Sequence, residues 1–327
     1  MGPRAALQSA LGGAYRFDRE LSVGTIGGAG TFLATDLAIG RPVVLKILSR
    51  DDSAAVSPDR FLTSLDPIRN LQHPNLVALL AAGRVETQLY YVTTYVHAEP
   101  LREVLARSGK LPTSDVVSML RDVGRALAHM HSRGVCHGDI TPGTLFQNGV
   151  STLVADAGIF RVLGKSTSPV YAAPDDEPID HRADLYSLGV VAYELLTGTP
   201  PFVGRSPAQL ASSHALEPPA PVTARRPATP PALAAVVMRL LEKRREDRVQ
   251  SAEELLAAIN EVRITPAERA SGPQTITPVQ PRLPARWSGE TPAEADRKIR
   301  RRVMVISAIL AVLIAGALLV TFARPGN

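Results

Sequence analysis

The sequence contains very little cysteine and few aromatic residues. Cys136 is the only cysteine, so no internal disulfide can form, and nothing in the cysteine content indicates an oxidising compartment. We expect Cys136 to be a small buried apolar residue. Aromatic residues make up 5% of the chain, and no basic face with interleaved aromatic side chains is visible, so we predict no nucleic-acid partner.

Charge is absent from one long stretch near the C-terminus. Residues 303–323 contain no Asp, Glu, Lys or Arg, and about 20 apolar residues suffice to cross a bilayer. Five basic residues lie just before it, within 297–302, and they equal the formal net charge of +5. Because Lys and Arg are retained on the cytoplasmic side, we predict a single-pass helix in the cytoplasmic membrane, in contact with the lipid bilayer. Residues 324–327 would form a short external tail.

The predicted membrane helix carries small residues at a spacing of four. Ser307, Ala311 and Ala315 would lie on one face, where small side chains let two helices approach closely. This spacing is compatible with a homodimer. The alternative is that an alanine-rich helix produces such spacings by chance.

A proline-rich segment precedes the basic residues. Residues 263–302 show no sustained apolar period, and we predict a disordered linker with a basic juxtamembrane cluster. Thr265, Thr277 and Thr291 are each followed directly by proline. They are candidate phosphorylation sites for an active Ser/Thr kinase, and a phosphothreonine-binding protein could then read them. The alternative is that they only reflect linker composition.

The rest of the chain predicts an α+β fold in which strands precede helices. After a tail at 1–13, strand signals at 41–48 and 88–96 indicate a small β-rich lobe over about 14–96. Apolar residues at helical spacing indicate a larger helical lobe over about 97–262. Its predicted helices, the first capped by Thr113 or Ser114, are 113–131, 184–196, 231–241 and 252–259.

Several motifs occur in a fixed order along these two lobes. A glycine-rich turn with Gly24 and Gly27 precedes the strand Val43-Val44-Leu45-Lys46. The segment His137-Gly138-Asp139 follows, then Asp156-Ala157-Gly158, then Ala173-Pro174-Asp175. Asp184-Leu185-Tyr186-Ser187-Leu188-Gly189 and Arg248 complete the order. In this order and spacing, residues 14–262 resemble a bacterial Ser/Thr protein kinase of the eukaryotic-like family.

The resemblance implies a bilobal fold and a nucleotide cleft. Lys46 would hold the α- and β-phosphates of ATP together with Gly24 and Gly27, and Asp156 would bind Mg²⁺ or Mn²⁺. Asp139 would be the catalytic base that orients the accepting hydroxyl. Ser166, Thr167 and Ser168 would lie in the activation loop as candidate phosphosites. Crowded His129, His131, Cys136 and His137 suggest a zinc site, but the kinase pattern already places two of these histidines structurally.

Other residues depart from the family pattern. The glutamate that pairs with the phosphate-binding lysine falls on Ser64, and Asp66 would point to a different helix face. Thr141 and Thr144 replace the lysine and the asparagine of the catalytic loop. Gly138 replaces the arginine that anchors a phosphorylated loop. Two loop glycines fall on Ile26 and Ala29, which resist the backbone conformation that glycine permits.

These losses favour a pseudokinase. Removing one pre-organised charge stabiliser lowers a rate by roughly 10²–10³, so the combined losses correspond to about 10⁴–10⁶. We therefore predict a membrane-anchored signalling scaffold or allosteric docking module. A weakly active ATP-dependent Ser/Thr kinase is the alternative, and a nucleotide-binding switch without transfer is a third possibility.

Overall fold

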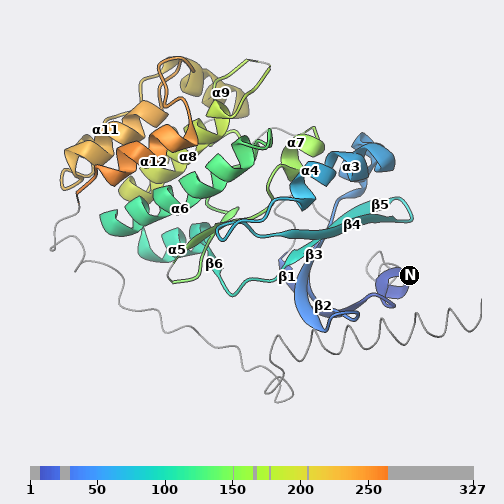
Figure 1. Cartoon of the computed structure of the whole chain (residues 1–327). Helices are drawn as coiled ribbons and strands as arrows, with labels where there is room; N and C mark the ends of the chain where they lie inside the picture. The colour runs from blue at the N-terminus through green and yellow to red at the C-terminus, as the bar shows by residue number, and fades with distance from the viewer. Residues whose placement is uncertain are drawn as a thin grey trace, which may run out of the picture. The chain divides into compact units, whose positions relative to one another are not determined.

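The computed structural model describes residues 8–22, 30–149, 151–164, 168–176, 178–204 and 206–263. The chain divides into two units, 1–275 and 276–327, and every described residue belongs to the first. This unit has a β-rich N-terminal lobe and a helical C-terminal lobe, as Figure 1 shows. The predicted membrane helix and most of the linker lie outside the described residues. In the part of the chain that is described, no helix has the length and apolar character needed to span a bilayer.

The N-terminal lobe is built on a five-stranded antiparallel sheet with the order β1-β2-β3-β5-β4. The predicted strand 41–48 is confirmed as β3, which alternates between buried and partly exposed side chains, as expected of a strand with one covered face. The predicted strand 88–96 ends two residues earlier than expected. The strands are β1 (Tyr15–Ser22), β2 (Gly30–Asp36), β3 (Arg41–Ile47), β4 (Leu79–Val85) and β5 (Gln88–Thr94).

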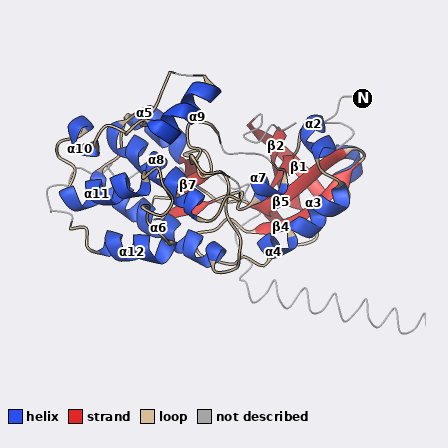
Figure 2. Cartoon of the chain, turned by 90° about the horizontal axis from the view of Figure 1, so that it is seen from above, coloured by secondary structure: helices blue, strands red, loops and turns tan. Residues whose placement is uncertain are grey.

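Three short helices connect β3 to β4 and lie beside this sheet (Figure 2). They are α2 (Arg50–Ala55), α3 (Pro58–Ser64) and α4 (Asp66–Arg69). Phe61, Leu65 and Ile68 are buried between these helices and the sheet. Leu11, within the predicted tail, is also buried and packs with Tyr15 in a second apolar cluster.

The C-terminal lobe is organised around two long helices that are almost entirely covered. The predicted helix 113–131 is confirmed with the same bounds as α6, and the predicted helix 184–196 is one or two residues longer at each end as α8. The expected side-chain cap of α6 is wrong, because Pro112 occupies the N-cap position and forms no side-chain cap. The helices are α5 (Leu101–Ser108), α6 (Thr113–His131), α7 (Ile159–Val162), α8 (Arg182–Thr197), α9 (Pro207–Leu216), α10 (Val222–Arg225), α11 (Pro231–Leu240) and α12 (Ala252–Asn260).

A small second sheet positions the loops between the two lobes. Its strands are β6 (Glu99–Pro100), β7 (Leu145–Gln147) and β8 (Thr152–Val154), in that order. Leu76 of the N-terminal lobe forms a parallel bridge with Val154. The loop of Asp139 precedes β7, and Asp156 follows β8 and reaches Lys46 of β3.

Candidate active site

Lys46 and Asp156, which are 110 residues apart in the sequence, form a direct ion pair. Lys46 Nζ lies 2.7 Å from Asp156 Oδ1 and 2.5 Å from Oδ2. Lys46 projects from β3, and Asp156 follows β8 with a φ of 62°, a left-handed conformation that is uncommon outside glycine. Both side chains are largely shielded from solvent, at 13% and 4% exposed. The predicted phosphate ligand and the predicted metal ligand therefore converge, and each neutralises the other.

Tyr91 is a third member of this cluster, and the sequence motifs do not reveal it. The register of β3 and β5 places Tyr91 directly opposite Lys46. Its hydroxyl donates a hydrogen bond to Asp156 Oδ1 over 3.1 Å. Burial, followed by the charge of Asp156, holds the pKa of Tyr91 well above its usual value, so this hydroxyl remains a donor.

Asp139 is buried in the loop that connects α6 to β7. Its backbone N–H donates to His137 Nδ1, and its Oδ1 has no hydrogen-bond partner among the described residues. Burial raises the pKa of Asp139 to about 7, although a hydrogen bond from the backbone N–H of Ser168 lowers it and nearby Asp156 raises it further. Ser168, a predicted phosphosite, thus contacts the predicted base through its backbone.

Asp184 holds the loop of Asp139 through backbone contacts. Its carboxylate accepts hydrogen bonds from the backbone N–H groups of His137 and Gly138, at 2.7 and 2.9 Å. It also contacts His131 Nε2 at 2.9 Å. These bonds fix the backbone of the loop without using any residue that the chemistry requires.

The hydroxyl groups of Thr141 and Thr144 are engaged with the backbone of the same loop. Thr144 Oγ1 donates to the carbonyl oxygens of Asp139 and Thr141, at 2.8 and 3.1 Å, and accepts from the N–H of Thr141. Thr141 Oγ1 accepts from the N–H of Gly143. Neither position supplies a positive charge, and the Thr144 oxygen is committed to closing the loop.

Ser64 ends α3 and carries no charge, so Lys46 has no ion-pair partner there. Asp66 begins α4, is mostly exposed and pairs with Arg69 at 3.3 Å. The expectation that Asp66 does not replace the missing glutamate agrees with this contact. In this chain the counter-ion of Lys46 is Asp156.

A different arginine occupies the space next to Gly138. A Cβ atom added to Gly138 would lie 2.5 Å from Cγ of Arg161, and Gly138 adopts a φ of 79°. Arg161 comes from α7 and donates a hydrogen bond to the carbonyl oxygen of Ile179 at 3.3 Å. The side chain of Arg161 therefore packs against Gly138 and leaves no room there for a larger residue.

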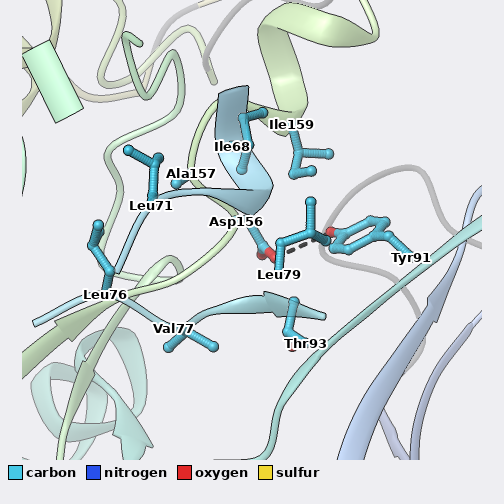
Figure 3. Close-up of a pocket in the computed structure, with 10 residues that line it drawn as sticks. All are labelled: Ile68, Leu71, Leu76, Val77, Leu79, Tyr91, Thr93, Asp156, Ala157 and Ile159. Atoms are coloured by element: carbon cyan, nitrogen blue, oxygen red, sulfur yellow. Dashed lines mark hydrogen bonds between the residues drawn. The ribbon is translucent and has the colours of Figure 1, made fainter. Parts of the chain in front are cut away.

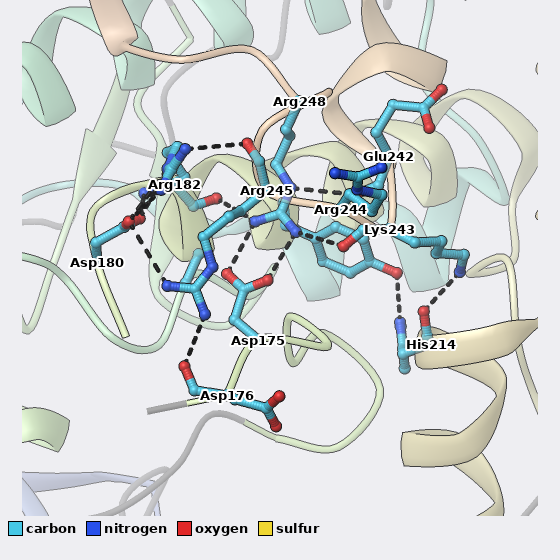
Figure 4. Close-up of polar contacts among 12 residues, drawn as sticks. Asp175, Asp176, Asp180, Arg182, His214, Glu242, Lys243, Arg244, Arg245 and Arg248 are labelled. Atoms are coloured by element: carbon cyan, nitrogen blue, oxygen red, sulfur yellow. Dashed lines mark hydrogen bonds and ion pairs between the residues drawn. The ribbon is translucent and has the colours of Figure 1, made fainter. Parts of the chain in front are cut away.

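The segment that follows Ser168 is fixed by a buried ion pair (Figure 4). Arg248 binds both oxygens of Asp175, at 3.0 and 2.8 Å, and the two side chains are 0% and 2% exposed. The guanidinium lies 4.9 Å from the ring centre of Tyr186. Arg245 donates to the carbonyl oxygens of Asp176 and Pro178. The predicted kinase elements Asp175 and Arg248 are thus brought together.

A cavity of about 300 Å³ lies beside Lys46 between the two lobes. Val44 and Phe146 line it from β3 and β7, together with Thr93 of β5 and Ala155. This size suits a small-molecule ligand, although it is at the lower end of the usual range. In the described residues, no group of three or more His, Cys, Asp or Glu side chains could hold a metal ion. Asp156 alone still suits Mg²⁺, which proteins usually hold through one or two carboxylates plus substrate phosphates.

Several predicted site residues lie outside the described residues. They are Gly24 and Gly27 of the nucleotide loop, Ser166 and Thr167 of the activation loop, and Thr265, Thr277 and Thr291 of the linker. Cys136, expected to be buried, is only partly buried. Burial and the charge of Asp184 nevertheless raise the pKa of its thiol to about 11.

The comparisons with known proteins agree with this geometry. Residues 15–259 match the family model described as "Protein kinase domain". The chain belongs to the protein kinase family. It is 32% identical to the serine/threonine-protein kinase PknB of Mycobacterium leprae over 266 residues, which cover 75% of this chain and 42% of that protein. It is also 32% identical to a probable serine/threonine-protein kinase, CE0033, of Corynebacterium efficiens, over 85% of this chain and 46% of that protein.

A solved structure shows the same protein kinase fold. The PknI kinase domain of Mycobacterium tuberculosis, in a cysteine-to-alanine mutant form, aligns with a TM-score of 0.63 and 28% identity, covering 76% of this chain and 95% of that one. The chain spans less than half of the length of the curated relatives that it matches. The bilobal kinase fold predicted from the motifs is therefore confirmed.

Proposed function

We propose that this protein kinase family member is a pseudokinase, whose cleft binds ATP without measurable phosphoryl transfer. The observation that carries the proposal is the engagement of Thr144, whose hydroxyl is bonded to the carbonyl oxygens of Asp139 and Thr141. A second metal ion at this position would compete with these hydrogen bonds of the loop. Thr141 adds no cation, so the developing charge on a transferring phosphoryl group would be poorly stabilised.

The residues that remain support nucleotide binding. Lys46 lines the cavity and is paired with Asp156, and divalent cations such as Mg²⁺ or Mn²⁺ neutralise phosphate charge when they are bound. ATP binding would require Lys46 to turn from Asp156 toward the phosphates. Because the ion pair is largely shielded, this exchange opposes binding, and we expect modest affinity.

A second candidate function is slow phosphoryl transfer to Ser or Thr. It is favoured by Asp139, whose Oδ1 has no partner among the described residues and whose pKa of about 7 suits a base near neutral pH. The hydrogen bond from Ser168 would have to leave room for a substrate hydroxyl.

Incubation with labelled ATP and Mg²⁺ or Mn²⁺ separates the two functions, with Asp139→Asn as the matched control. We expect no incorporation above the control. Incorporation that disappears in Asp139→Asn would establish the weak kinase instead. A rise in melting temperature with ATP and metal, lost in Lys46→Ala, would establish nucleotide binding, and together with absent incorporation it would establish binding without transfer.

We further propose that the domain acts as a docking module tethered to the cytoplasmic membrane through residues 303–323. The support is the uncharged stretch and the basic residues before it. Phosphorylation of Thr265, Thr277 and Thr291 by an active kinase would create sites for a phosphothreonine-binding protein. Mass spectrometry after co-expression with such a kinase tests this idea, and a linker without phosphate would remove it.

A further inference from the structure

Tyr91 contacts both charged members of the cleft from the interior. Its hydroxyl lies 3.1 Å from Asp156 Oδ1, and its ring centre lies 5.8 Å from Lys46 Nζ. The side chain is fully buried, at 0% exposed. A tyrosine at this depth needs a partner for its hydroxyl, because an unpaired buried polar group is destabilising. Asp156 provides that partner.

The surroundings of this hydrogen bond are apolar (Figure 3). Ile68, Leu79 and Ile159 line the same small pocket, which has room for no more than about one water molecule. Ala157, which follows Asp156, also lines this pocket, and Tyr91 is the aromatic residue of its lining. In such a setting a hydrogen bond to a charged acceptor is stronger than at the surface.

The two oxygens of Asp156 have different partners. Oδ1 accepts from both Lys46 and Tyr91, whereas Oδ2 accepts from Lys46. If Lys46 turns toward a nucleotide, Oδ1 keeps its hydrogen bond to Tyr91, and Oδ2 becomes available. The tyrosine therefore keeps the orientation of the carboxylate after the ion pair opens.

We propose that Tyr91 is a positioning residue, which holds Asp156 in place through Oδ1 so that Oδ2 can receive the divalent cation of a bound nucleotide. Ser64 has no charge and cannot hold Lys46 as an acidic residue at that position would. Tyr91 instead holds Asp156, through its hydrogen bond to Oδ1. The metal-binding part of this inference rests on the proposed nucleotide binding, but the hydrogen bond itself does not.

A double-mutant cycle on the nucleotide-free protein tests the hydrogen bond. Tyr91→Phe is measured in the wild-type and Asp156→Ala backgrounds, and Tyr90→Phe is the control because Tyr90 precedes Tyr91 on β5 and its hydroxyl lies near Gly83. We expect Tyr91→Phe to raise the unfolding equilibrium constant at least about tenfold in the wild type but much less in Asp156→Ala. Equal effects in the two backgrounds would overturn the proposal.

A Mg²⁺ titration tests the positioning role with a different readout. At fixed ATP, the Mg²⁺ concentration that gives half of the ATP-induced rise in melting temperature should increase about tenfold in Tyr91→Phe and stay unchanged in Tyr90→Phe. An unchanged Mg²⁺ midpoint in Tyr91→Phe would overturn the positioning role. If the wild type shows no ATP-induced shift at any Mg²⁺ concentration, the proposed nucleotide binding fails together with the metal-positioning role, and the cycle still decides whether the hydrogen bond operates.

Discussion

Two regions differ in how well their side chains match the family pattern. One is the buried ion pair of Arg248 with Asp175, in the segment that follows Ser168, and the other is the nucleotide cleft around Lys46. In the first region, Arg248 and Asp175 form a bidentate ion pair that is buried from solvent. In the cleft, Lys46 is paired with Asp156, and Thr141 and Thr144 are bonded to the backbone. The first region serves the fold, whereas the second holds the positions that the family pattern assigns to phosphoryl transfer. The ion pair of the first region is intact, whereas in the second Lys46 and Asp156 are present but Thr141 and Thr144 stand where the family pattern has a lysine and an asparagine.

The largest effect should come from breaking the region that serves the fold. Arg248→Ala leaves the carboxylate of Asp175 buried without its partner, and we expect a loss of about 3–5 kcal/mol in the free energy of unfolding. Urea denaturation measures it. Arg244→Ala is the matched control, since Arg244 is 76% exposed and its substitution should change stability by less than about 0.5 kcal/mol. Similar losses in both variants would remove the contrast between the two regions.

A second prediction concerns the nucleotide cleft, where the lysine and the asparagine of the family pattern can be put back. In Thr141→Lys combined with Thr144→Asn, a cation and a second metal ligand return, and we expect phosphoryl transfer to rise by roughly 10²–10³. Incorporation of labelled phosphate measures it, with Asp139→Asn added to the same double variant as the control. If ATP still binds and transfer does not increase, another position limits phosphoryl transfer, for example Ser64.

The buried carboxyl group of Asp139 should make the free energy of unfolding depend on pH. Its pKa of about 7 in the folded protein exceeds the roughly 3.9 of an unfolded chain, so the native state binds more protons between these values. The contribution of Asp139 to wild-type stability should therefore fall as the pH rises from about 4 to about 7. Asp139→Asn should be more stable than the wild type by roughly 1–4 kcal/mol at pH 8, and the difference should shrink as the pH is lowered through the same window. Thermal unfolding at several pH values checks this, and a difference independent of pH would contradict the raised pKa.

The sequence predicts the long elements well and singles out candidate site residues, because both depend on local pattern. The helix 113–131 follows from its apolar period, and Lys46, Asp139 and Asp156 follow from ordered motifs. The role of Tyr91 could not be predicted, since it depends on the register of β5 against β3.

The substitution at Gly138 shows a second limit of the sequence. The motif predicts the loss of an arginine, but not that the side chain of Arg161 packs against Gly138. Predicting this contact requires knowing how α7 packs on the catalytic loop. A single sequence carries no signal for that contact.

The smallest effect is expected for Asp66, which is tested as a possible acidic partner of Lys46. Asp66 lies two residues from Ser64, but its carboxylate is 63% exposed and pairs with Arg69 at 3.3 Å. Because exposed ion pairs contribute little, Asp66→Ala should change the free energy of unfolding by less than about 0.5 kcal/mol. It should also leave any ATP-induced rise in melting temperature unchanged, whereas Lys46→Ala abolishes it. Loss of the shift in Asp66→Ala would mean that this carboxylate reaches Lys46 once ATP is bound. The cleft would then retain the ion pair that Ser64 cannot form, and the contrast with the region around Arg248 would be smaller than the nucleotide-free structure indicates.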